Sequence, residues 1–102
     1  MKRWYSDCVR HFLTLYIDDM EVGTQPKFKN SVERENWMAC HSVISTLDPQ
    51  DAQLVVEMYR RGDTLADNIY QLATARKTSQ RTFWNLADDI EYKIAQKRGL
   101  LP

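Results

Sequence analysis

The sequence predicts an all-α protein of about five helices. Through most of its 102 residues, apolar side chains recur at spacings of three and four, which is the period of one face of a helix. The apolar stretches are separated by glycine, by proline or by residues that typically cap helix ends, and none alternates as a strand does. We therefore expect five helices and no sheet.

The composition is that of one globular domain. Hydrophobic residues make up 43% of the chain and charged residues 27%, which excludes an intrinsically disordered protein. Because domains cluster around roughly 100–150 residues, residues 1–102 form a single domain. Within it we expect residues 1–46 to be an N-terminal helical pair and residues 47–102 to be a helix-turn-helix part.

The first helix is expected over about residues 3–21, and Gly23 with Pro26 ends it. Its apolar face holds Trp4, Cys8, Val9, Phe12, Leu13, Tyr16, Ile17 and Met20. This face is rich in aromatic residues, which leaves two alternatives open. Either the face packs on the following helices alone, or part of it forms a symmetric homodimer that sets two DNA-binding parts against two half-sites.

The second helix is expected to begin at Asn30 or Ser31 and to end near Thr46. Asn30 and Glu33 have the spacing of a capping box, in which the two residues satisfy free N–H groups at a helix start. Cys8 and Cys40 fall in the apolar patterns of the first two helices without the spacing of a zinc or redox motif. We predict that both are buried thiols.

The third helix shows the sharpest start in the chain. Asp48 can cap it, and Pro49 then occupies the first helical position, where the missing N–H group costs nothing. Gly62 is expected to close this helix. A fourth helix starts at Asp63 or Thr64.

The apolar period of the fourth helix is lost over residues 74–78, where we expect a turn. Ser79 is the predicted N-cap of a fifth helix, which runs to Arg98 with Gly99 just beyond it. On this helix the period buries Phe83 and leaves its neighbour Trp84 at least partly exposed.

This order of helices and caps is that of a helix-turn-helix, whose second member presents its first residues to the major groove of DNA. Arg81 has the geometry to read guanine, and Gln80 and Asn85 have the amide geometry that pairs with adenine. The predicted DNA contacts are Arg76, Lys77, Ser79, Gln80, Arg81, Thr82, Trp84 and Asn85.

Charge along the chain supports this assignment locally, although the formal net charge of zero does not. No acidic residue follows Arg76 and Lys77 until Asp88. We expect Asp88 and Asp89 to lie on a solvated face, and these two acids together with Glu91 to repel DNA from the later part of the helix. The alternative is that Ser79 opens an ordinary solvated helix with no ligand.

Several segments carry a family resemblance. Leu47-Asp48-Pro49, Tyr59-Arg60-Arg61-Gly62, Leu72-Ala73 and Ser79-x-x-Thr82-Phe83 resemble region 4 of sigma factors. The run from Tyr59 to Leu100, with Asp67-Asn68-Ile69-Tyr70 and Lys97-Arg98-Gly99-Leu100, is similar to late transcription activators of phages and prophages of the ArpU/RinA type. The resemblance implies a helix-turn-helix regulator that binds double-stranded promoter DNA and assists RNA polymerase.

A second function is compatible with the sequence. Net neutrality favours a small protein-binding module, such as a phage inhibitor of a host complex like RNA polymerase or a CRISPR nuclease. The chain has no phosphate-binding glycine loop, nucleophile elbow or metal-ligand spacing, so we expect no enzyme, no cofactor and no metal. It has neither a membrane-spanning run nor a signal peptide, so we expect a cytoplasmic protein.

Overall fold

The computed structural model describes residues 3–23 and 27–101, so Pro26 lies outside the described residues. These residues form five helices and no strand, which confirms the predicted fold class. The helices are α1 (Ser6–Val22), α2 (Ser31–Ile44), α3 (Pro49–Met58), α4 (Leu65–Arg76) and α5 (Gln80–Lys97).

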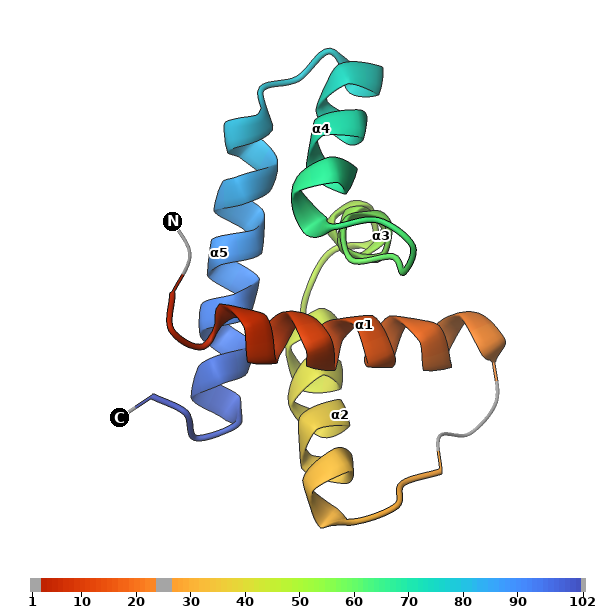
Figure 1. The fold of residues 1–102 in the computed structure, drawn as a ribbon, viewed down its shortest axis with the longest axis vertical. Coiled ribbons are helices and arrows are strands. Elements are labelled where there is room, and N and C mark those ends of the chain that lie inside the picture. Colours follow the sequence, from red (N-terminus) through yellow and green to blue (C-terminus); the bar gives the residue numbers. More distant parts are fainter. Residues whose placement is uncertain (1–2, 24–26, 102) are drawn as a thin grey trace.

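Helix α1 crosses the molecule near its middle and packs on both α2 and α5 (Figure 1). The C-terminal half of α5 lies beside α2, and its N-terminal half lies beside α4. Helices α4 and α5 run in opposite directions and are joined at one end of the long axis of the molecule (Figure 1). All five helices contribute buried side chains to one hydrophobic cluster, which holds this arrangement together.

Four helices begin at residues that the sequence predicts as caps, and in each the cap side chain accepts a hydrogen bond from a backbone N–H group of the first turn. The sequence offered two candidate cap residues for α2 and two for α4. In the structure, Asn30 caps α2 and Thr64 caps α4. The donor–acceptor pairs are Glu33–Asn30 at 2.9 Å, Asp51–Asp48 at 2.9 Å, Asp67–Thr64 at 3.1 Å and Arg81–Ser79 at 3.2 Å.

The prediction that Gly62 closes the third helix is wrong, because α3 ends at Met58. The Asn68 side chain explains the earlier end. Its Nδ2 atom donates to the carbonyl oxygens of Met58, at 2.8 Å, and of Arg60, at 3.2 Å. A side chain from α4 thus satisfies carbonyl groups that would otherwise favour another helical turn.

The turn between α4 and α5 is shorter than predicted. Helix α4 continues to Arg76, and Lys77 then adopts a left-handed conformation with φ of 53°. The N–H group of Thr78 donates to the carbonyl oxygen of Ala73 at 3.0 Å, as at many helix ends that reverse in this way. The apolar period in the sequence ends before α4 does, because residues 74–76 are helical but exposed.

The two cysteines differ in burial. Cys40 is fully buried in the core, as predicted, but the prediction for Cys8 is wrong because its side chain is exposed. The buried stripe of α1 is narrow and runs through Val9, Leu13 and Ile17, so that Cys8 falls beyond its edge. Burial also raises the pKa of the Cys40 thiol to about 12, which suppresses the reactive thiolate.

No helix in residues 3–23 and 27–101 combines the length and the apolar character that crossing a lipid bilayer requires.

We predict that iodoacetamide at pH 8 labels Cys8 and leaves Cys40 unmodified in the folded protein. The physical reason is that Cys40 is both inaccessible and held as the neutral thiol. Mass spectrometry of tryptic peptides measures this, with the urea-unfolded chain as the control in which both thiols react. Equal labelling of both cysteines in the folded protein would show that α2 does not pack as described.

Candidate nucleic-acid interface

The predicted DNA contacts cluster at the junction of α4 and α5, which we call the α4–α5 tip (residues 76–82). Figure 1 shows this junction at one end of the long axis, away from α1 and α2. The tip side chains are all exposed, and so is Asn85 one turn further along α5. The exposed members of the predicted set of DNA contacts are Arg76, Lys77, Ser79, Gln80, Arg81, Thr82 and Asn85.

Buried residues on either side hold the tip in place. Ala73 near the end of α4 and Phe83 in the first turn of α5 both belong to the core. Between them, the Thr78 hydroxyl donates to the carbonyl oxygen of Arg76 at 3.1 Å, and Ser79 caps α5. The backbone of the tip is therefore fixed while its polar side chains remain available.

The charge at the tip differs from the sequence expectation at one residue. Arg76 is the nearest tip cation to α3, and its Nη2 atom lies 3.1 Å from Oε2 of Glu57. Glu57 is far from Arg76 along the chain and is brought close to it only by the fold. No ion pair within residues 3–23 and 27–101 involves Lys77 or Arg81, and the first turn of α5 holds no acidic residue.

Trp84 is set apart from the other predicted contacts. It is half-buried while Phe83 is buried, which confirms the prediction that Trp84 stays partly exposed. The guanidinium carbon of Arg10, a residue of α1, lies 5.9 Å from the centroid of the Trp84 ring. The structure therefore places Trp84 in contact with the scaffold rather than within the exposed group at the tip.

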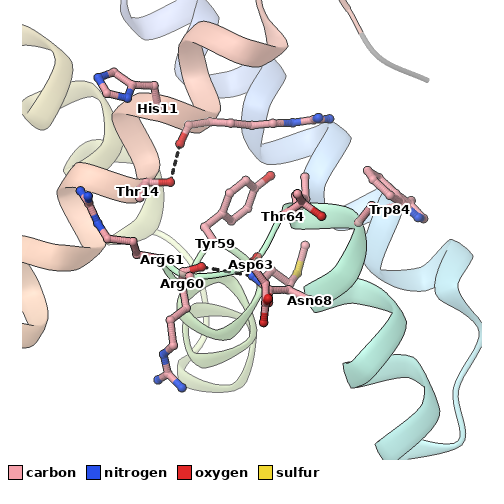
Figure 2. A pocket seen from close by; sticks show the side chains of 14 residues that line it. His11, Thr14, Tyr59, Arg60, Arg61, Asp63, Thr64, Asn68 and Trp84 are labelled. Atoms are coloured by element: carbon pink, nitrogen blue, oxygen red, sulfur yellow. Dashed lines mark hydrogen bonds between the residues drawn. The ribbon is translucent and has the colours of Figure 1, made fainter.

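Trp84 also lines a cavity of about 410 Å³ between α1 and the α3–α4 connection (Figure 2). Arg60 and Arg61 lie on this connection and line the cavity (Figure 2), and each forms an ion pair with an acid of α1. Arg61 pairs with Asp18 at 2.6 Å, and Arg60 pairs with Glu21 at 3.3 Å. Because these charges are already balanced, the cavity is a weaker candidate for an anionic ligand than the tip.

A buried polar cluster on α5 was missed by sequence reasoning. Glu91 is 1% exposed, and its Oε2 atom accepts hydrogen bonds from Nε of Arg10 at 3.0 Å and from the Tyr59 hydroxyl at 2.5 Å. Glu91 therefore does not stand with Asp88 and Asp89 as a surface acid that could repel DNA, contrary to the prediction. One signal was present, since Glu91 lies four residues after Ala87 and three before Ile94, on the buried face.

The other two acids of the predicted acidic face have different surroundings. Asp89 is exposed and pairs with Lys93 at 2.9 Å, whereas Asp88 is half-buried. An acidic surface on this part of α5 is thus smaller than predicted, because Glu91 is turned inward.

Burial is the main cause of a strongly raised pKa for Tyr59, and the neighbouring carboxylate of Glu91 raises this pKa further. The phenol therefore remains protonated and continues to donate to Glu91. Because the pKa of Tyr59 in the folded protein lies above its ordinary value of 10.0, the contribution of this phenol to stability is complete below about pH 10 and is lost as the pH rises through the folded pKa.

The chain matches no protein-family model, no curated protein and no solved structure. In the part of the chain that the structure describes, no three His, Cys, Asp or Glu side chains are grouped so that they could hold a metal ion.

We predict that Tyr59→Phe lowers the free energy of unfolding by about 1.5–3 kcal/mol, because it removes a hydrogen bond to a buried carboxylate. Tyr70→Phe is the matched control, since Tyr70 is 60% exposed, and it should change stability by less than about 0.5 kcal/mol. Urea denaturation measures both. An equal effect of the two substitutions would contradict the role assigned to the buried cluster.

Proposed function

We propose that this protein binds double-stranded DNA through the α4–α5 tip. The observation that carries the proposal is the combination of two exposed cations, Lys77 and Arg81, neither of them in an ion pair with a described residue, with a capped helix start that lacks acidic residues. Backbone N–H groups and the positive end of the α5 dipole attract a phosphate at such a start.

The side chains of the tip suit two kinds of contact. Lys77 can contact phosphates, which fixes the position of a protein on the duplex without reading its sequence. Arg81 supplies the bidentate geometry that recognises guanine, and Gln80 supplies the geometry for adenine. Asn85 would extend base contacts by one helical turn. Arg76 would first have to exchange Glu57 for a phosphate.

The finer assignment rests on the family resemblance. According to this resemblance, α4 and α5 act as the two members of a helix-turn-helix similar to region 4 of sigma factors. The protein is then a transcription regulator of phage or prophage type. Such a regulator acts in the host cytoplasm and assists RNA polymerase at a promoter. Its binding as a homodimer would bring a second tip to a second half-site.

A protein-binding module is the second candidate, favoured by the neutral net charge and by apolar side chains left on the surface. Trp4 is 73% exposed and Val22 is 69% exposed. An inhibitor of a host complex, such as RNA polymerase or a CRISPR nuclease, would bind through side chains of this kind. In that case substitutions at the tip would leave partner binding intact.

We predict that Arg81→Ala weakens binding to a duplex from the upstream region of its own gene by about fivefold or more, because a bidentate base contact contributes roughly 1–3 kcal/mol. Fluorescence anisotropy at fixed salt measures the affinity. Arg34→Ala is the matched control, since Arg34 is an exposed arginine on α2 without an ion pair to a described residue.

The control should change the affinity for the duplex by less than about twofold, because salt screens the charge of an arginine that lies far from the bound DNA. Equal losses for Arg81→Ala and Arg34→Ala would remove the tip as the contact surface. If the Arg81→Ala variant bound the duplex as tightly as the unsubstituted protein, the tip would also be ruled out as the contact surface.

A further inference from the structure

A second surface lies along the groove between α2 and the C-terminal half of α5. Two adjoining hollows of about 610 and 450 Å³ share Ser42 and Lys97, so they form one continuous groove, which we call the α2–α5 groove. At 1.5 Å per residue, the 18 residues of α5 span about 27 Å, and the groove lies at the opposite end of this helix from the tip (Figure 1).

The groove concentrates positive charge in a chain whose formal net charge is zero. Its lining contains four cations, Arg34, Lys93, Lys97 and Arg98, and one acid, Glu35. Arg98 pairs with Glu35 at 3.3 Å, and Lys93 pairs with Asp89 at 2.9 Å. Arg34 and Lys97 are both exposed and have no ion pair with any described residue. Two positive charges thus face the groove without compensation.

The groove also offers an apolar contact. Met38 is 48% exposed and lines the groove together with the cations, and the buried side chains of Ala39 and Val43 form part of the lining. Methionine adapts its shape to apolar groups and is common at peptide-binding surfaces. A phosphate backbone alone would gain nothing from this contact, whereas a peptide that carries both acidic and apolar side chains would use the whole groove.

We infer that the α2–α5 groove binds an acidic, amphipathic segment of another protein. Acidic side chains of the segment pair with Arg34 and Lys97, and an apolar side chain packs on Met38. Charge complementarity favours this occupant over a second copy of the chain. The inference goes beyond DNA binding and does not depend on it, because the groove and the tip share no residue.

The test uses the full chain and a fluorescein-labelled helical peptide composed of glutamate and leucine, with anisotropy at low salt as the measurement. Lys97→Glu and Arg34→Glu should each weaken binding about tenfold, because they place like charges opposite the peptide. Lys27→Glu makes the same change in net charge at an exposed position outside the groove, and it should change the affinity by less than about twofold.

Lys97→Gln serves as a second variant that removes the charge without reversing it, and circular dichroism checks the fold of each variant. Met38→Asp should also weaken binding, whereas Arg81→Ala should leave it unchanged. Three results would each overturn the inference: equal losses for Lys27→Glu and Lys97→Glu, equal affinity for a polyglutamate without leucine, or a stronger effect of Lys97→Glu on duplex DNA than on the peptide.

Discussion

The buried carboxylate of Glu91 is the constraint on which the arrangement of the helices depends. A buried charge is costly unless it is paired and hydrogen-bonded, and here the two donors come from different elements, Arg10 on α1 and Tyr59 just after α3. The placement of α1, α5 and the α3–α4 connection in this structure satisfies all three groups at once. Since α5 also carries the start of the proposed DNA contact, this cluster fixes the scaffold against which the tip is presented.

The distribution of charge connects the fold with the proposed functions. Arg60 and Arg61 on the α3–α4 connection are balanced by Glu21 and Asp18 of α1. Lys77 and Arg81 at one end of the molecule and Lys97 at the other have no such partner among the described residues. A net charge of zero therefore conceals two separate positive surfaces. Each suits an anionic partner of a different kind, a nucleic acid at the tip and an acidic peptide in the groove.

Local features were predictable from the sequence and tertiary ones were not. The caps Asp48 and Ser79 act within a few residues of the chain, so their residue types suffice to place helix starts. The pairing of Arg76 with Glu57 and the early end of α3 depend on residues that only the folded chain brings together. The period of α5 placed Glu91 on the core face, but residue type argued for the surface, because an unpaired glutamate is almost never buried.

The salt dependence of affinity for double-stranded DNA tests the central claim most directly. If Lys77, with or without Arg76, neutralises phosphates while Arg81 contacts a base, the logarithm of the association constant should fall linearly with the logarithm of salt concentration, with a slope of about −1 to −2. This slope reflects the counterions that each phosphate contact releases. A slope near zero, or no binding at low salt, would contradict the account.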